Sequence, residues 1–294
     1  MRVLVTGARG QVGTELIQQG EDLELQMLAA GHAELDITQQ DAVNGFIQVQ
    51  QPDIVINAAA YTAVDQAESE PELAYAINRD GAAYLAQACA DNNIPLLHLS
   101  TDYLFDGSKE GTYSETDSPN PQGVYGKSKL EGDRAIDSIL KQYLILRVSW
   151  VFGANGNNFV KTMLRLGKER DVLRVVADQQ GGPTWAGAIA TTLLNLVKRW
   201  GDGEAIPWGT YHYSGQPATT WQGFAEAIFE QAEKLGMIDK QPKVEPITTA
   251  EYPTPAQRPL NSVFDCHKIA RKLGIPQPDW RTGLNNVLIN WKEQ

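Results

Sequence analysis

The sequence predicts an α/β protein: a doubly wound parallel sheet followed by a smaller, mainly helical C-terminal region. The first observation is a glycine-rich turn at residues 7–13, between a short apolar run and a helical pattern. The second is an alternation of apolar runs with helical periodicity over the first 150 residues, which is typical of βαβ units. The third is a break in that regularity after Trp150, where proline-rich loops join helical patterns.

The first predicted strand, residues 2–6, leads directly into the glycine-rich turn. Glycines at positions 7, 10 and 13 permit a tight turn, close approach of the backbone to a pyrophosphate, and packing of the next helix on the sheet. That helix N-terminus offers unpaired amides and a positive dipole end to phosphates. The spacing differs from the G-x-G-x-x-G fingerprint, and glycine-rich turns also occur without a ligand. Its place between strand and helix nevertheless favours a dinucleotide-binding Rossmann domain.

Further apolar runs predict strands at residues 24–28, 53–57, 94–100 and 143–149, and periodicity predicts helices at residues 71–92 and 125–139. Ligands of parallel sheets bind beyond the carboxyl ends of the strands. We therefore expect four segments to meet at one edge of the sheet: Gly7, residues 58–62, Ser100-Thr101 and Ser149-Trp150.

The remaining chain is less regular. A loop is predicted at residues 153–158, a helical region from Pro183-Thr184 to about Trp200, and helices at residues 221–235, 267–273 and 283–291. We expect residues 1–150 with part of 184–215 to form the dinucleotide-binding domain. Residues 151–183 and 216–294 would then form a substrate-binding region.

Composition narrows the class of protein. Of the 294 residues 42% are hydrophobic, enough for a buried core, and no apolar run approaches the ~18 residues of a membrane span. A net charge of −11 argues against nucleic acid or an anionic membrane as a partner. The two cysteines lie far apart in the sequence, so neither a disulfide framework nor a zinc site is expected. The four histidines lack the spacing of metal ligands, and no signal segment for export is recognised. We expect a cytoplasmic enzyme acting on a small molecule, with structural histidines.

A possible catalytic group lies at Tyr125 and Lys129, four residues apart and hence on one face of a helix. A nearby ammonium lowers the pKa of a phenol, and such a tyrosine can exchange a proton with a carbinol oxygen while a hydride moves at the attached carbon. Thr101 ends the apolar run at residues 94–99, so its hydroxyl could hold the same oxygen. Tyr-x-x-x-Lys alone is common by chance, and the glycine-rich turn upstream is what gives it weight.

Together these features resemble the extended short-chain dehydrogenase/reductase superfamily, and within it the dTDP-4-dehydrorhamnose reductase family, over nearly the full length. The resemblance is carried, in order and in register, by Val3, Thr6-Gly7-Ala8-Arg9-Gly10-Gln11-Val12-Gly13, Leu35-Asp36-Ile37-Thr38, Asn57-Ala58-Ala59-Ala60-Tyr61-Thr62-Ala63-Val64-Asp65-Gln66-Ala67-Glu68, Ser100-Thr101-Asp102-Tyr103-Leu104-Phe105-Asp106-Gly107, Tyr125-Gly126-Lys127-Ser128-Lys129, Arg147-Val148-Ser149-Trp150, Asp178-Gln179 and Arg258-Pro259-x-Asn261-Ser262.

The resemblance implies hydride transfer from a nicotinamide to the C4 ketone of dTDP-4-dehydro-6-deoxy-L-mannose, giving dTDP-L-rhamnose. Tyr125 would protonate the nascent alkoxide, Lys129 would hold the nicotinamide ribose and tune Tyr125, and Thr101 would orient the carbonyl. The resemblance also implies that the pyrophosphate of the cofactor would be bound by Gly10, Gln11 and Val12. The adenine would lie against Asp36 and Ile37, and the rest of the cofactor against Ala60, Tyr61 and Thr62. The substrate would be contacted by Asp102, Trp150 and Arg258.

Several of these residues also have plain structural interpretations. Trp150 could equally be a core aromatic residue, and Arg258 could be a solvated surface residue rather than a fork for the substrate's diphosphate. Asp65 could belong to a ligand loop or cap a turn.

The choice between NADPH and NADH stays open. After the second predicted strand the chain reads Ala29-Ala30-Gly31-His32, with no acidic residue for a ribose 2′-hydroxyl and no arginine for a 2′-phosphate. Arg9, in the glycine-rich turn, could reach a 2′-phosphate, which slightly favours NADPH.

Magnesium is doubtful. In some members of the family it lies at a dimer contact, held by acidic residues near the glycine loop and shortly after the Pro-Thr pair. Glu15 matches the first position, but Gly187 stands at the second and offers no carboxylate. Since a hard cation needs several oxygen ligands, we expect neither a bound metal nor that dimer, and both a monomer and a homodimer stay open.

Two other functions are considered. A nucleotide-sugar dehydratase or epimerase has the same superfamily fold, but dehydratases typically carry an acidic pair after the threonine, and here Tyr103 follows Asp102. A catalytically silent regulatory subunit is disfavoured because Thr101, Tyr125 and Lys129 are all retained. The nucleotide base and the stereochemistry at C4 are not fixed by the sequence.

Overall fold

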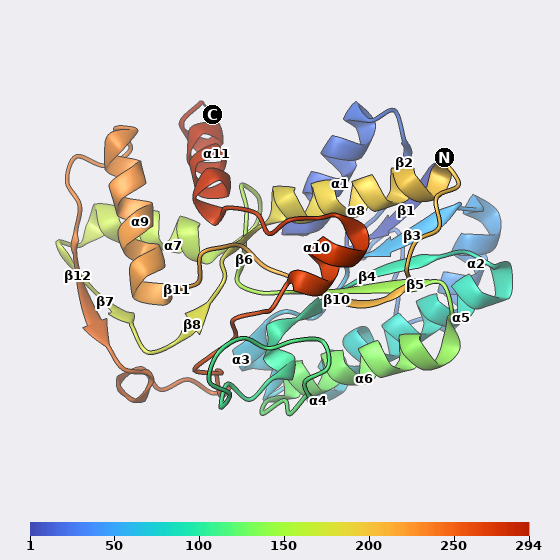
Figure 1. Ribbon diagram of the computed structural model, residues 1–294, viewed down its shortest axis with the longest axis horizontal. Coiled ribbons are helices and arrows are strands. Elements are labelled where there is room, and N and C mark those ends of the chain that lie inside the picture. Colours follow the sequence, from blue (N-terminus) through green and yellow to red (C-terminus); the bar gives the residue numbers. More distant parts are fainter. Residues whose placement is uncertain (294) are drawn as a thin grey trace.

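The computed structural model describes residues 1–293, and its centre is a six-stranded sheet with helices on both faces (Figure 1). All neighbouring strands of this sheet pair in parallel. Their spatial order is β10 (Gly209–Tyr213), β5 (Tyr143–Val148), β4 (Leu96–Thr101), β3 (Ile54–Asn57), β1 (Arg2–Thr6) and β2 (Gln26–Ala30). Along the chain, β2 is added on one side of β1, and β3, β4, β5 and β10 are added on the other side. This confirms the doubly wound α/β prediction. In such sheets the ligand crevice lies where the strand order reverses, which here is beyond the carboxyl ends of β1 and β3.

Alternating strand residues supply the two core layers. Val3 and Val5 point to the side covered by α1 (Gln11–Asp22) and α8 (Ala186–Gly201). Leu4, between them, points to the side covered by α2 (Gln40–Gln50), α5 (Ala82–Asn92) and α6 (Val124–Ile139). Because both faces are covered, the strands are nearly continuous apolar runs, as parallel sheets require.

The helical stretch predicted at residues 71–92 is confirmed, with an irregularity at its centre. It comprises α4 (Pro71–Tyr75), a π-helical turn η1 (Ala76–Gly81) and α5. Single π-turns inside α-helices occur often at functional sites. Here the turn carries Asn78, which is buried.

A separate apolar core lies beside the sheet. It is built from α7 (Phe159–Glu169), α9 (Trp221–Lys234), α11 (Trp280–Glu293) and the parallel pair β7 (Val172–Val176) and β12 (Lys243–Ile247). At its centre the rings of Phe152, Phe224 and Trp280 pack together. Two short strand pairs join it to the rest: β6 (Val151–Phe152) with β9 (Thr184–Trp185), and β8 (Gln180–Gly181) with β11 (Thr219–Thr220).

The remaining short elements are α3 (Val64–Ala67), the 3₁₀ turns η2 (Asp102–Leu104) and η3 (Thr249–Glu251), and α10 (His267–Leu273). The predicted helix at residues 267–273 matches α10. No helix within residues 1–293 combines the length and apolar character needed to cross a bilayer.

Three expectations were wrong in detail. The second strand begins at Gln26 rather than Glu24, because Glu24 adopts a left-handed conformation with φ 56° and ends a turn. The helical region expected from Pro183-Thr184 begins at Ala186, because Thr184 and Trp185 pair with β6. The segment after the predicted loop at residues 153–158 forms α7, where no helix was predicted.

Candidate active site

A cavity of about 620 Å³ opens beyond the carboxyl ends of β1, β3, β4 and β5. It brings together the segments expected at that edge, from the glycine-rich turn to Trp150. The residues that line it are Gly10, Gln11, Val12, Ala58, Ala60, Thr62, Val64, Leu99, Ser100, Thr101, Asp102, Tyr103, Tyr125, Lys129, Val148, Trp150, Val151, Gly156, Asn157 and Trp221.

The glycine-rich turn packs closely against neighbouring backbone. Gly7 has φ +67°, and a Cβ added there would lie 2.5 Å from the amide nitrogen of Ala59. A Cβ on Gly13 would lie 2.1 Å from the Gly7 carbonyl oxygen, so α1 packs directly on the turn. Gly10 precedes α1 without a side-chain cap, and its neighbours Gln11 and Val12 face the cavity. A free helix N-terminus at the cavity wall fits the pyrophosphate of a dinucleotide.

Thr101, Tyr125 and Lys129 lie together on the opposite wall. Thr101 is the last residue of β4, while Tyr125 and Lys129 lie in the first turns of α6. Burial raises the pKa of Tyr125 to about 12; a hydrogen bond with Thr101 opposes this rise, and the Asp102 and Asp133 carboxylates add to it. The predicted lowering of the Tyr125 pKa is therefore wrong for this structure, because burial is the largest influence and Lys129 is not among the groups that shift this pKa. A protonated phenol results, which is the form that donates a proton.

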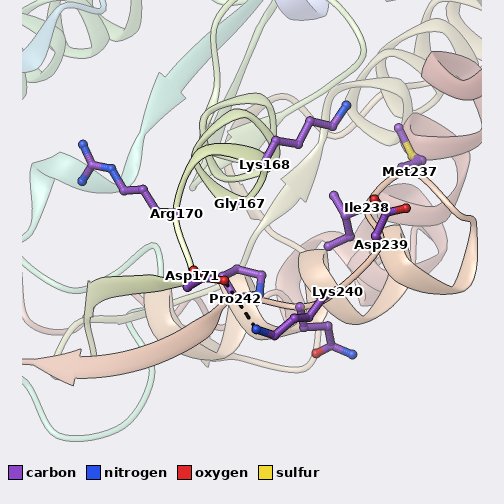
Figure 2. Close-up of a pocket in the computed structure, with 10 residues that line it drawn as sticks. Gly167, Lys168, Arg170, Asp171, Met237, Ile238, Asp239, Lys240 and Pro242 are labelled. Carbon is purple, nitrogen blue, oxygen red and sulfur yellow. Dashed lines mark hydrogen bonds and ion pairs between the residues drawn. The ribbon is translucent and has the colours of Figure 1, made fainter.

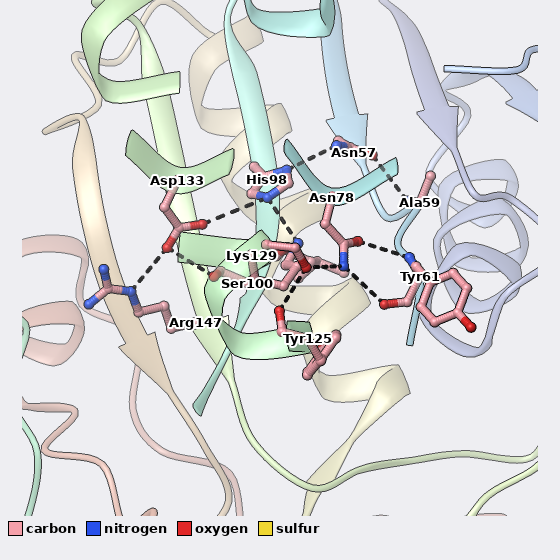
Figure 3. A network of polar contacts seen from close by, with 12 residues as sticks. Asn57, Ala59, Tyr61, Asn78, His98, Ser100, Tyr125, Lys129, Asp133 and Arg147 are labelled. Carbon is pink, nitrogen blue, oxygen red and sulfur yellow. Dashed lines mark hydrogen bonds and ion pairs between the residues drawn. The ribbon is translucent and has the colours of Figure 1, made fainter. Parts of the chain in front are cut away.

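Lys129 is almost fully buried and belongs to a polar network behind the cavity wall (Figure 3). Its Nζ donates to the Leu99 carbonyl at 2.7 Å and lies 3.1 Å from Nε2 of His98. Burial lowers the pKa of Lys129 to about 8, against the opposing effect of Asp133. His98 therefore does more than fill the core, although its isolated position in the sequence gave no sign of this.

Asp102 and Tyr103 continue the wall past Thr101. Asp102 is 3% exposed, accepts a hydrogen bond from Thr101 Oγ1 at 3.1 Å, and has its pKa raised to about 6 by burial. The Tyr103 ring lies edge-on against Tyr125, with ring centroids 5.4 Å apart. This ring contact helps to fix the direction of the Tyr125 ring.

Trp150 lines the cavity as part of an aromatic pair. Its indole stacks on Trp221 with centroids 3.6 Å apart and an interplanar angle of 4°. Trp150 has φ 46°, and its ring lies so close to Gly181 that an added Cβ would be 2.4 Å from it. Trp150 is therefore both packed and exposed to the cavity. Trp221 was missed because it comes from α9, in the separate core, and carries no motif.

Arg258 lies in the C-terminal loop and is held by Asp65. Two parallel hydrogen bonds, of 3.1 and 2.8 Å, join its guanidinium to the Asp65 carboxylate, which also accepts from the Ala256 amide. These bonds lower the pKa of Asp65, with Arg258 the largest cause. Arg258 is not a freely solvated residue, since only 24% of its side chain is exposed. The pair ties the C-terminal loop to the segment after β3.

The loop after β3 is fixed by Asn78, which, like Trp221, no motif in the sequence indicated. The Asn78 side chain accepts from the Tyr61 amide at 2.9 Å, and it donates to the Tyr61 carbonyl at 3.1 Å and to Ser128 Oγ at 3.0 Å (Figure 3). Ala60 and Thr62 consequently face the cavity, whereas the Tyr61 hydroxyl donates to Glu70. The π-turn thus connects this loop to the helix that carries Tyr125.

The residues expected near the adenine and its ribose lie in different environments: a turn, the core and the exposed surface. Asp36 accepts from the amide and hydroxyl of Thr38 within a turn, and Ile37 is buried in the core. Arg9 is exposed and pairs with Glu34 at 2.5 Å; Glu34 also accepts from the Gly31 amide at 2.9 Å. Glu34 is thus an acidic residue near the end of β2, two residues beyond the stretch 29–32.

Glu15 and Gly187, the two positions considered for magnesium, are joined by the side chain of Gln19. The Gln19 side-chain amide donates to Glu15 at 3.2 Å and to the Gly187 carbonyl at 3.1 Å. In the described part of the chain, no three His, Cys, Asp or Glu side chains are grouped as a metal site.

A second hollow, of about 370 Å³, lies between the end of α7 and the loop before β12 (Figure 2). Its charged side chains include Lys168, Arg170 and Lys240, and Lys240 is paired with Asp171 at 3.4 Å. It is lined by none of the residues assigned to catalysis or cofactor binding.

The chain is similar to proteins of one family over nearly its whole length. The family model described as RmlD substrate binding domain matches residues 1–292. A dTDP-4-dehydrorhamnose reductase from Aggregatibacter actinomycetemcomitans is 49% identical over 97% of this chain and 98% of its own length. The crystal structure of such a reductase from Clostridium acetobutylicum is 38% identical, with a TM-score of 0.91 over 100% of both chains.

A further solved structure, of dTDP-4-dehydrorhamnose reductase from Bacillus anthracis in complex with NADP, is also 38% identical. It has a TM-score of 0.90 and covers 98% of this chain and 99% of that one. Since the match of the family model extends over nearly the whole chain, this protein belongs to the RmlD substrate-binding domain family.

Proposed function

We propose that this protein is an oxidoreductase that uses NADPH or NADH to reduce the C4 ketone of dTDP-4-dehydro-6-deoxy-L-mannose, forming dTDP-L-rhamnose. The observation that carries this proposal is one cavity with the glycine-rich turn on one wall and Thr101, Tyr125 and Lys129 on the other. The names of the relatives, and the NADP bound to one of them, support the same reaction.

A reduced nicotinamide, when bound, supplies the hydride that reaches C4. Tyr125, protonated at neutral pH, donates its hydroxyl proton to the carbonyl oxygen as that oxygen gains negative charge. The Thr101 hydroxyl, which donates to Asp102 at 3.1 Å in this structure, would turn its hydrogen to the same oxygen and hold it in place. Lys129, whose Nζ is held by the Leu99 carbonyl, lines the cavity in which the ribose of the cofactor would lie.

The separate core supplies the opposite side of the site. Trp221 reaches the cavity from α9, and together with Trp150 it offers an aromatic surface to the sugar or base. Residues 151–183 and 216–294 would then bind substrate, while residues 1–150 with part of 184–215 bind the dinucleotide. Asp102 would contact the sugar, and Arg258 would use its remaining N–H groups for the diphosphate.

Replacing Arg258 by alanine should raise KM for the nucleotide sugar by about tenfold or more, since a charge-assisted contact contributes roughly 1.5–3 kcal/mol. KM for NADPH should stay within about twofold if the contact is to the substrate alone. Arg174→Ala, which removes a surface arginine paired with Glu251, is the matched control. Equal effects on both KM values would indicate a loop-anchoring role through Asp65 instead.

Cofactor preference is tested at Arg9. Arg9→Ala should weaken NADPH binding much more than NADH binding, because only NADPH carries a 2′-phosphate for the guanidinium. Fluorescence titration of both cofactors measures the ratio, with Glu34→Gln as the companion variant. Equal losses for NADPH and NADH would remove Arg9 from the specificity argument.

Assembly and location are part of this proposal. We place the enzyme in the cytoplasm, and its free, buried cysteines, Cys89 and Cys266, suit a reducing compartment. A monomer or a homodimer would present the same cavity, and sedimentation analysis distinguishes them.

The decisive experiment adds dTDP-4-dehydro-6-deoxy-L-mannose to the protein and NADPH, follows NADPH oxidation, and identifies the product. A reductase consumes one NADPH per sugar and yields dTDP-L-rhamnose. A dehydratase would instead convert dTDP-glucose without net NADPH consumption, an epimerase would interconvert sugar nucleotides without it, and a silent subunit would do neither.

A further inference from the structure

Residues 178–181 follow β7, include β8, and contact several elements around the cavity. Gly181 packs so closely on the Trp150 ring that a Cβ added there would lie 2.4 Å from it. Gln180 makes two backbone hydrogen bonds of 2.8 Å with the C-terminal loop, at residues 260 and 262. The segment therefore links Trp150 to a loop that is distant in the sequence.

The Gln179 side chain lies in a row of hydrogen bonds whose direction is fixed. It is 5% exposed; its Oε1 accepts from Trp221 Nε1 and its Nε2 donates to Thr249 Oγ1, both at 3.1 Å. Thr249 Oγ1 in turn donates its proton to the Asp178 carboxylate at 2.7 Å. An indole N–H can only donate, and the Thr249 proton is already used. The Gln179 amide therefore fits this row in one orientation only.

Trp221 needs this bond because ring packing alone leaves it a freedom. Its indole stacks on Trp150 with centroids 3.6 Å apart, and the Phe159 ring lies 4.7 Å away, tilted by 51°. Such contacts fix the plane of an indole but allow it to slide within that plane. The hydrogen bond to Gln179 uses the single N–H of the indole and fixes the direction in which it points.

We propose that Gln179 is a positioning residue that holds Trp221 in place on Trp150, so that the two indoles form one aromatic wall for the nucleotide sugar. Both indoles line the cavity, and Gln179 acts on the ligand through Trp221. The proposal rests on the proposed function in the identity of the ligand. A wall that is ordered in advance loses less side-chain freedom on binding, which increases affinity.

The effect of Gln179 should fall on binding rather than on hydride transfer. Thr101 and Tyr125 come from β4 and α6, whereas the row that includes Gln179 connects β8, α9 and η3. Loss of the Gln179 amide should therefore raise KM for the nucleotide sugar and leave kcat unchanged, as expected for an interaction that binds substrate and transition state equally.

The first test follows the indole N–H of Trp221 by ¹H–¹⁵N spectra of protein labelled at tryptophan, with Trp221→Phe to assign the signal. In the unmodified protein its hydrogen exchange should be at least about tenfold slower than that of an exposed indole. Gln179→Met removes the acceptor and should accelerate this exchange by about tenfold or more. Thr249→Val, which removes the anchor of Gln179 Nε2, should accelerate it by a smaller factor.

Gln231→Met is the matched control. Gln231 also lies on α9, and its side-chain amide donates to Asn285 of α11 at 2.6 Å. This variant should leave the exchange of the Trp221 indole within about twofold of that in the unmodified protein. Equal acceleration by Gln231→Met and Gln179→Met would indicate a general loosening of α9 and would contradict the proposal.

The second test measures the affinity for dTDP-L-rhamnose by calorimetry. Gln179→Met should raise Kd by about fivefold or more, which corresponds to the loss of one hydrogen bond. Kd for NADPH and kcat should stay within about twofold. Trp221→Phe keeps an aromatic ring but lacks the N–H, so in that background Gln179→Met should change Kd by less than about twofold. An equal rise in both backgrounds would show that Gln179 does not act through Trp221.

The two tests separate this proposal from the proposed function. If the unmodified protein failed to bind dTDP-L-rhamnose, the proposed function would be refuted, and the exchange measurement would still show whether Gln179 holds Trp221. If Gln179→Met left the exchange of the Trp221 indole unchanged, the role of Gln179 would be refuted whatever the protein binds.

Discussion

Replacing Tyr125 by phenylalanine is expected to reduce kcat by about 10²–10⁴-fold, the usual contribution of a positioned general acid. The variant keeps the ring that packs against Tyr103 and loses only the hydroxyl that donates to the substrate oxygen. KM for NADPH and the melting temperature should change little. The measurement is steady-state NADPH oxidation with the nucleotide sugar.

Tyr143→Phe is the matched control, because it removes a tyrosine hydroxyl that bonds Asp137 and not the cavity. Its turnover should equal that of the unmodified enzyme. If Tyr125→Phe retained more than about a tenth of the activity, another group would have to be the proton donor.

Replacing Gly13 by alanine should damage both the fold and cofactor binding. The added Cβ would lie 2.1 Å from the Gly7 carbonyl and 2.8 Å from Ala8 Cα, and both are backbone atoms that cannot rotate away. Overpacking of this kind costs about 1–3 kcal/mol, and each kcal/mol lowers Tm by about 2–4 °C in a domain of 150–250 residues. Displacement of the turn should also weaken NADPH binding by about tenfold or more.

Replacing Gly45 by alanine, in contrast, should stabilise the protein. Gly45 lies within α2 with open space around it, so alanine there should stabilise the protein by about 0.5–1 kcal/mol. Thermal unfolding and NADPH titration of both variants test the comparison. A Gly13→Ala protein as stable as the unmodified one would show that α1 is free to move away from the turn.

The sheet and the reacting residues were predictable because their signals are local. Val3, Val5 and the other buried strand residues form short apolar runs, and parallel sheets require such runs on strands covered on both sides. The glycine-rich turn, Thr101 and the Tyr125–Lys129 pair each combine a residue type with a spacing. A reader of the sequence can therefore place them on a strand end or a helix face.

The rest of the site depends on contacts between segments distant in the sequence. Trp221 reaches the cavity because α9 packs in a separate core. Asn78 does not line the cavity but, from the π-turn, bonds the loop after β3. His98 faces Lys129 only once β4 and α6 are packed. The pKa of Tyr125 could not be read from the lysine spacing either, since burial decides it.

The return of the chain to the sheet as β10 has a consequence for any attempt to divide the protein. β10 pairs with β5 from Gly209 opposite Leu144 to Tyr213 opposite Val148. A fragment ending near residue 150 would leave the backbone N–H and C=O groups of β5 unpaired at an open edge, where strands of other copies can add. We therefore expect residues 1–150 alone not to fold as an autonomous unit, and a circularly permuted chain that keeps β10 beside β5 would be the sounder route to isolating the proposed dinucleotide-binding domain.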